Sequence, residues 1–269
     1  MHLNVPLLLA TPWLLGPVVT ILRARHSRSL DEEQSAPPSD PPLVSLIIPA
    51  RNEESNIRRC VESALLSTYP RLEVIVVDDH STDETSAIVR ELAERDARLR
   101  VIVPPALPSG WFGKQWACAS GVTVSGGEVL GFMDADTVQS HDLVTRIVNA
   151  MVSRRADMLS VAGTQEMGGF WERIVQPQIF SILLQRYGGT ESVNRSRHAS
   201  QKIANGQCLW LRRSAYESLG GHASVRDKVA EDLSLAQLYF RAGHVVALVL
   251  GLSQLSTRMY TSLRELVDG

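Results

Sequence analysis

Two short apolar runs of this sequence end abruptly in acidic residues. The run 128–133 is followed by an Asp-Ala-Asp tripeptide at 134–136, and the run 72–77 is followed by two aspartates at 78–79. A short apolar run that stops at a carboxylate predicts a buried strand with the acid at its C-terminal end. Because open α/β sheets bind ligands at the carboxyl ends of their strands, the sequence predicts a ligand site at this edge.

The acidic strand ends also indicate a kind of ligand. Hard divalent cations take oxygen ligands and bridge phosphates, so two such ends in one sheet suit Mg²⁺ or Mn²⁺ held against a phosphorylated molecule. An Asp-Ala-Asp tripeptide alone more often marks a solvated turn. The prediction of a metal site therefore depends on the motifs around it.

Strand and helix patterns alternate through the middle of the chain. Helices are predicted after Asn52, after a capping box at 81–84, over 115–125 and from about 140. Strand patterns cover 43–48, 72–77, 101–103, 128–133, 157–161 and 244–252. This alternation predicts an α/β fold in which helices flank a mostly parallel sheet over residues 43–255.

Later segments are less regular. The apolar, aromatic stretch 170–187 contains Pro177; it predicts either a core helix, which we favour slightly, or an amphipathic helix on a membrane. The polar stretch 188–202 predicts a mobile loop. Residues 256–269 form a C-terminal segment. Few residues that typically end a helix or strand precede Gly269, which suggests a truncated chain.

The first residues differ in composition from the rest. Residues 3–22 contain no charged side chain, and Arg23, Arg25 and Arg28 follow them. About 20 apolar residues are enough to cross a bilayer, and the basic cluster predicts a cytoplasmic C-terminal side. We therefore expect a transmembrane anchor at 3–22 in the cell membrane, although it contains three prolines. A proline-rich linker at 27–42 then leads to a cytoplasmic domain.

Composition excludes several classes of function. With 27 basic and 29 acidic residues the charge is balanced, so we expect no nucleic-acid partner. Three scattered cysteines predict neither a disulfide framework nor a zinc site, and the histidines lack metal-ligand spacing. The sequence contains no GxSxG, GxGxxG or P-loop motif. It therefore does not indicate a serine hydrolase, a dinucleotide-binding protein or a P-loop nucleotide-binding protein.

Six motifs in order give the chain a family resemblance. They are 49–54, 77–83, 113–121 (Gly113-Lys114, Ala117 and Gly121), 134–136, 205–206 and 231–232. With these motifs the chain resembles the family-two glycosyltransferases over about residues 43–245, and a longer match around 110–117 looks most like the membrane-bound carotenoid- and hopanoid-associated members. The resemblance implies a nucleotide-sugar-binding fold of the GT-A type and a metal-dependent, inverting transferase of the hexosyltransferase type.

The resemblance also implies roles for the nucleotide-binding residues. It places Asp136 on the metal, Asp134 beside the ribose and metal, and Asp79 on the base. Pro49, Arg51 and Glu53 would line the nucleotide. Glu53 could instead serve only as negative charge at a helix N-terminus.

Lys114 and Asp232 complete the candidate site. Lys114 could pair with a phosphate as a point charge, or be an ordinary solvated lysine. The resemblance makes Asp232 the general base that deprotonates the acceptor hydroxyl, with Asn205 and Gly206 lining the acceptor pocket. The acidic pair at 231–232 could equally be a partner of the helix dipole.

Three functions remain open. The first is a membrane-anchored transferase that moves one sugar from a nucleoside diphosphate sugar to a lipid- or isoprenoid-like hydroxyl acceptor. A single transfer is favoured because the chain lacks the Gln-x-x-Arg-Trp segment of processive members. The second is a polyprenyl-phosphate sugar synthase, whose phosphate acceptor needs no strong base. The third is a non-catalytic nucleotide-sugar-binding protein.

Overall fold

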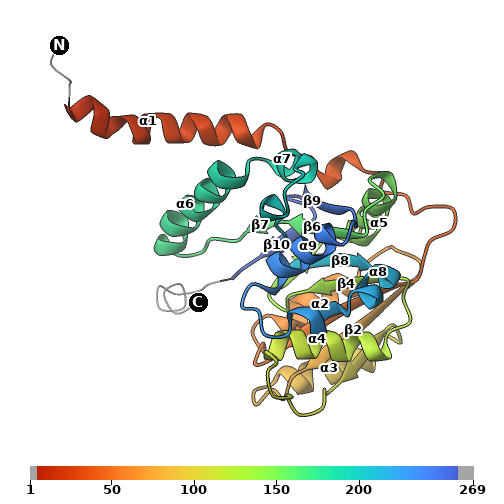
Figure 1. Cartoon of the computed structure of the whole chain (residues 1–269). Coiled ribbons are helices and arrows are strands. Elements are labelled where there is room, and N and C mark those ends of the chain that lie inside the picture. The colour runs from red at the N-terminus through yellow and green to blue at the C-terminus, as the bar shows by residue number, and fades with distance from the viewer. Residues whose placement is uncertain (1–4, 260–269) are drawn as a thin grey trace.

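A central seven-stranded sheet organises the molecule (Figure 1). The computed structural model describes the main chain of residues 5–259. The strand order is β3-β2-β1-β4-β8-β6-β9, and β8 alone runs antiparallel to its neighbours. The mostly parallel α/β sheet is thus confirmed. The strands are β1 Val44–Ala50, β2 Leu72–Asp78, β3 Leu99–Ile102, β4 Val129–Met133, β6 Met158–Ala162, β8 Cys208–Arg212 and β9 Val246–Leu250.

Helices cover both faces of this sheet because successive strand side chains alternate between two apolar layers. In β1, Leu46 and Ile48 belong to one buried layer, whereas Ile47 belongs to the other. The first layer contains the helices α2 Ile57–Leu65, α3 Thr85–Ala93 and α5 Leu143–Ser153. The second contains α4 Gly113–Val124, α8 Arg213–Ser218, η3 Gly221–Val225 and α9 Glu231–Arg241.

Strand register brings the acidic strand ends together. β1 pairs in parallel with β2 and β4, so that Ala50 lies opposite Asp78 and Ile47 opposite Phe132. A small second sheet follows β4 directly and consists of β5 Thr137–Gln139, β10 Leu255–Thr257 and β7 Thr164–Gln165. It fixes the chain immediately after Asp136.

The first element that the structure describes is an N-terminal helix. Helix α1, Val5–Ala24, covers most of the predicted anchor, and residues 3 and 4 lie outside the described part. Among the helices that the structure describes, none combines the length and apolarity that crossing a bilayer requires. The predicted linker that follows packs on the domain: in η1, Leu30–Glu32, Leu30 is fully buried, and its carbonyl accepts a hydrogen bond from Arg146 at 3.1 Å.

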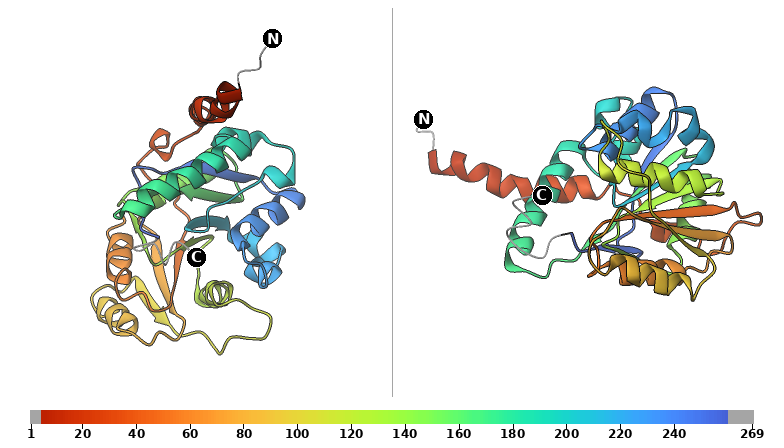
Figure 2. Two further views of the ribbon diagram at one scale, coloured as in Figure 1. Left: turned by 90° about the vertical axis from the view of Figure 1, so that its left-hand side faces the viewer. Right: turned by 90° about the horizontal axis from the view of Figure 1, so that it is seen from below.

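Helix α6, Phe170–Tyr187, lies beside α1 rather than in the core (Figures 1 and 2). Arg23 of α1 donates to the carbonyl of Gln185, and the Gln185 side-chain amide donates to Thr20. The favoured core position for 170–187 is wrong. Its exposed apolar side chains are Phe170, Trp171, Ile174, Ile179, Phe180, Ile182 and Leu183.

The stretch 188–202, predicted to be a mobile loop, contains helical structure. It contains α7 Thr190–Arg195 and the short helix η2 Ala199–Gln201. Lys202 is buried, and its ammonium donates hydrogen bonds to the carbonyls of Val193 and Asn194 at 2.9 and 2.7 Å. These internal bonds replace the solvent contacts that the sequence suggested.

Candidate active site

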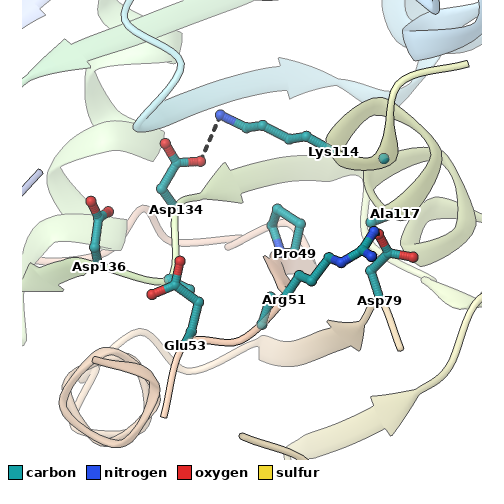
Figure 3. A pocket seen from close by; sticks show the side chains of 11 residues that line it. Pro49, Arg51, Glu53, Asp79, Lys114, Ala117, Asp134 and Asp136 are labelled. Atoms are coloured by element: carbon teal, nitrogen blue, oxygen red, sulfur yellow. Dashed lines mark hydrogen bonds and ion pairs between the residues drawn. The ribbon is translucent and has the colours of Figure 1, made fainter. Parts of the chain in front are cut away.

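A pocket of about 320 Å³ opens where β1, β2 and β4 end (Figure 3). Of the eight residues predicted to bind the nucleotide or the metal or to act as the base, seven line it, and Asp232 does not. The lining residues are Pro49, Ala50, Arg51, Glu53, Asp79, Gly113, Lys114, Ala117, Asp134, Ala135 and Asp136. Figure 3 shows the Glu53, Asp134 and Asp136 carboxylates toward one side and the Arg51–Asp79 pair toward the other.

Asp79 and Arg51 form one side of the pocket. The Asp79 amide donates to the Ala50 carbonyl at 2.8 Å, which fixes the turn after β2 beside the end of β1. The Arg51 guanidinium lies 3.5 Å from the Asp79 carboxylate. A Cβ on Gly113 would lie 3.0 Å from the same carboxylate, so glycine at this position lets α4 begin close against Asp79.

Lys114 connects two elements of the site. Its ammonium lies 2.7 Å from an Asp134 oxygen after β4 and 3.3 Å from a Glu231 oxygen at the start of α9. Burial opposes the charge on Lys114, but the two carboxylates raise its pKa above the ordinary value. Burial raises the pKa of Asp134 while Lys114 lowers it. Lys114 therefore pairs with two carboxylates of the site, although 39% of its side chain is exposed to solvent.

Asp136 and Glu53 lie close to other carboxylates, and neither forms an ion pair with a basic side chain among the described residues. Burial first, and then the charges of Asp134 and Glu53, raise the pKa of Asp136 to about 6. Burial, with a further contribution from Asp134, also raises the pKa of Glu53. This accumulation of negative charge is an arrangement that a bound cation would stabilise.

The oxygen donors fit a metal ion that is shared with a ligand. No group of three potential metal-ligating side chains is found among residues 5–259. Mg²⁺ commonly binds through one or two carboxylates and completes its shell with water and substrate phosphates. Asp136, with Asp134 and Glu53 close enough to shift its pKa, meets that requirement.

Asp232 lies beyond this pocket but is held firmly near it. One carboxylate oxygen accepts the Gly206 amide at 2.8 Å, and the other accepts the Leu233 amide at 2.7 Å. Burial raises its pKa. The adjacent Glu231 joins Asp232 to the pocket through Lys114. The bond to Leu233 shows that Asp232 also contributes to the start of α9, as the alternative interpretation suggested.

Two contributors were not among the predicted site residues. Glu231 belongs to the acidic pair at 231–232, but only its contact with Lys114 reveals a part in the site. Gln207 follows Asn205 and Gly206 directly, and its carbonyl accepts the Asp134 amide at 3.1 Å. Its place after that dipeptide was the only signal in the sequence.

Comparison with known proteins identifies the family. Residues 45–220 match the sequence profile described as "Glycosyl transferase family 2". Among curated relatives, 4,4'-diaponeurosporenoate glycosyltransferase of Staphylococcus haemolyticus (strain JCSC1435) is 26% identical over 230 residues, 84% of this chain and 59% of that protein. Probable glycosyltransferase YdaM of Bacillus subtilis (strain 168) is 31% identical over 214 residues, 76% of this chain and 48% of that protein. The chain thus spans about half to three-fifths of these relatives.

Solved structures share the fold. The mannosyltransferase PcManGT of Pyrobaculum calidifontis, in complex with GDP-Man and Mn²⁺, superimposes with a TM-score of 0.66 at 20% identity, covering 95% of this chain and 68% of that one. TarS 1-349 of S. aureus, in complex with UDP-GlcNAc, gives a TM-score of 0.56 at 17% identity, covering 83% and 60%. These similarities support a GT-A-like fold.

Proposed function

Since the chain belongs to glycosyl transferase family 2, we propose that it transfers a single sugar from a nucleoside diphosphate sugar to a hydroxyl of a lipid-like acceptor, with inversion. One observation carries this proposal: seven residues from distant sequence motifs line a single pocket at the carboxyl ends of β1, β2 and β4. The relatives named for a carotenoid acid, 4,4'-diaponeurosporenoate, support an apolar acceptor.

The nucleotide would lie along the Arg51–Asp79 side of the pocket. Asp79 is buried and accepts hydrogen bonds, so it can recognise a base N–H, and Arg51 lies beside it. The diphosphate would then extend toward Lys114 and the carboxylates of Asp134 and Asp136. This direction places the bond to be broken on the side of the pocket that Lys114 links to α9.

A Mg²⁺ or Mn²⁺ ion would be held by Asp136, with Asp134 and Glu53 nearby. When bound, it would neutralise charge on the leaving diphosphate as a Lewis acid. PcManGT, which shares the fold, was solved with Mn²⁺ and GDP-Man. Lys114 would contribute a further positive charge from the protein, and its ion pairs with Asp134 and Glu231 hold it in place.

Asp232 would accept the proton of the acceptor hydroxyl. A general base needs a carboxylate of raised basicity at a fixed position, and the burial and two amide bonds of Asp232 supply both. Attack from the face of the sugar opposite the departing diphosphate inverts the anomeric carbon. The hydroxyl proton then resides on Asp232, while the bonding electrons of the sugar–oxygen bond leave with the diphosphate.

We also propose that the protein works at a membrane surface, on the cytoplasmic side. Exposed apolar side chains gather on the neighbouring helices α1 and α6, including Leu15 and Ile21 on the first and Phe170 and Ile182 on the second. Exposed apolar groups of this extent favour contact with a lipid interface. The basic residues after α1 suit an anionic membrane.

The decisive experiment supplies purified full-length chain with a panel of nucleoside diphosphate sugars, Mn²⁺ and a lipid extract. Mass spectrometry should detect a lipid whose mass increases by one sugar residue, and NMR should show inverted anomeric configuration. The Asp79→Ala variant serves as the control that lacks the base contact. Absence of any product, together with absence of donor binding in calorimetry, would refute the proposed function.

A further inference from the structure

A second, larger pocket lies beside the proposed active site. Its volume is about 520 Å³, within the range of about 300–1,000 Å³ that is usual for small-molecule sites. Most of its lining is apolar, and the described residues around it include no charged side chain. Leu183 and Leu184 of α6 form one wall, and Leu248 and Leu250 of β9 contribute to another.

Gln207 links this pocket to the donor site. Its backbone carbonyl accepts the amide of Asp134, which lines the donor pocket, at 3.1 Å, while Gln207 itself lines the apolar pocket. The preceding residue, Gly206, donates its amide to Asp232 at 2.8 Å. Two consecutive residues therefore connect the apolar pocket with both the strand-end carboxylates and the proposed base.

The Gln207 side chain has an unused donor. It is 4% exposed, and its amide nitrogen has no hydrogen-bond partner among the described residues. Its amide oxygen accepts from Gln165 at 2.9 Å and from Asn205 at 3.2 Å. Because Asn205 also donates to the Val161 carbonyl at 3.1 Å, its nitrogen is identified, and this fixes which Gln207 atom is the oxygen.

A buried donor without a partner costs stability unless a ligand or water satisfies it. On the wall of an apolar pocket, such a donor suits a molecule with one hydrogen-bond-accepting oxygen at the end of an apolar chain. A charged or highly polar ligand would find no counter-charge among the lining residues. The residues that line the pocket thus favour a ligand with an apolar chain and one uncharged polar end.

We propose that this pocket binds the apolar chain of the acceptor, and that Gln207 positions the oxygen-bearing end of that acceptor toward Asp232. This inference rests on the proposed function and specifies its substrate class: a long apolar molecule that ends in a hydroxyl. Gln207 is then a positioning residue whose side-chain amide donates to the acceptor oxygen, while Asp232 removes its proton.

The test measures binding to the full chain with a neutral fluorescent polyene, the methyl ester of cis-parinaric acid, as the probe. The wild type should bind it, and Leu183→Trp, which fills the pocket from α6, should weaken binding about tenfold or more. Ile182→Trp is the matched control: the neighbouring side chain on the same helix is 64% exposed and does not line the pocket. It should bind the probe as the wild type does.

Competition tests the role of Gln207. Decanol should displace the probe roughly tenfold better than decane, since one hydrogen bond is gained. Gln207→Leu, which keeps a similar volume, should remove that preference while retaining probe binding. It should raise KM for the acceptor and leave donor affinity unchanged.

Three results would overturn the inference. They are equal probe binding by Leu183→Trp and the wild type, no probe binding by the wild type, and an unchanged decanol preference in Gln207→Leu. Calorimetry with UDP and GDP in the presence of Mn²⁺ separates this inference from the proposed function. Nucleotide binding without probe binding refutes only the acceptor pocket, whereas loss of both refutes the proposed function as well.

Discussion

Lys114 and Asp134 form an ion pair of 2.7 Å between the start of α4 and the end of β4. The same ammonium lies 3.3 Å from Glu231 at the start of α9. A single lysine thus holds together the donor pocket and the helix that carries the proposed base. If a diphosphate enters, its negative charge meets an ammonium that is already fixed in position.

Replacing Lys114 should therefore weaken donor binding. Lys114→Gln removes the positive charge and leaves the Asp134 and Glu231 carboxylates uncompensated, so nucleoside diphosphate affinity should fall roughly 10–100-fold. The matched control is Lys228→Gln, whose lysine pairs with the exposed Asp227 and does not line the pocket. Calorimetry checks both variants. Equal losses in the two would show that overall charge, and not position, is responsible.

The effect of the metal ion on nucleoside diphosphate binding should require Asp136. In Asp136→Asn, Mn²⁺ should no longer strengthen nucleoside diphosphate binding, because the amide is a poorer ligand for a hard cation. EDTA should weaken binding by the wild type to the level of this variant. The control Asp227→Asn alters an exposed carboxylate and should retain the metal effect. Identical affinities of the wild type with and without Mn²⁺ would contradict the prediction.

The Asp232→Asn variant should lose most of its transfer rate and keep its affinity for the donor. The substitution retains size and can still accept the Gly206 amide, but it removes the proton acceptor, so the rate should fall roughly 10²–10⁴-fold with an alcohol acceptor. A phosphate acceptor, which needs no strong base, should suffer far less and would identify the polyprenyl-phosphate alternative. If the variant lost donor binding instead, Asp232 would be a structural residue of α9.

Folding stability should decrease in mild acid because of His222. Burial, and secondly Lys114, lowers its pKa from 6.5 to about 3. Below pH 6.5 the imidazole of the unfolded chain binds a proton, whereas the buried imidazole of the folded chain does not. The contribution of His222 to the free energy of unfolding is therefore fully present above pH 6.5 and is lost as the pH falls toward 3. The slope from this group is about 1.4 kcal/mol per pH unit.

Urea denaturation at pH 7 and pH 5 measures this contribution. His222→Gln can retain the bond with Tyr216, at 2.9 Å from the ring nitrogen in the native protein, and should reduce the stability difference between the two pH values by about 2 kcal/mol. His141→Gln, at an exposed position, is the control. A stability difference that is unchanged in His222→Gln would contradict the assignment.

Membrane contact should depend on the exposed face of α6. Substituting Trp171, Ile174 and Ile182 by serine should lower binding to vesicles containing anionic phospholipid by roughly tenfold or more. The control substitutes Leu66, Val103 and Val152, which are exposed apolar residues outside α1 and α6. Cosedimentation compares the two. Equal loss in both sets would mean that α6 is not the membrane-facing element.

The sequence predicted the donor side of the fold well because its signals are local. β1, β2 and β4 are apolar runs that stop at polar residues, and parallel pairing then brings their ends together. β8 was missed because Cys208–Arg212 is short and its antiparallel position between β4 and β6 depends on partners far along the chain.

Other features depend on contacts that a pattern does not record. The apolar content of α6 predicted burial, but its neighbour is α1 and much of its apolar surface is exposed. The candidate residues for the nucleotide and the metal line one pocket as expected, whereas Asp232 lies outside it, and the chemical roles of all of them stay predictions. The link from Lys114 to Glu231 and the unused donor of Gln207 arise only from three-dimensional proximity.

The pairing of β10 with β5 has a consequence for how the protein is made. Thr257 faces Thr137, with 3.1 Å between their hydroxyl oxygens across 120 residues of chain, and β5 follows Asp136 directly. Because synthesis proceeds from the N-terminus, the strand that ends in the carboxylates is complete long before β10 leaves the ribosome. The nascent chain should therefore form its nucleotide-binding strands early and gain a fixed Asp136 loop only after β10 has emerged.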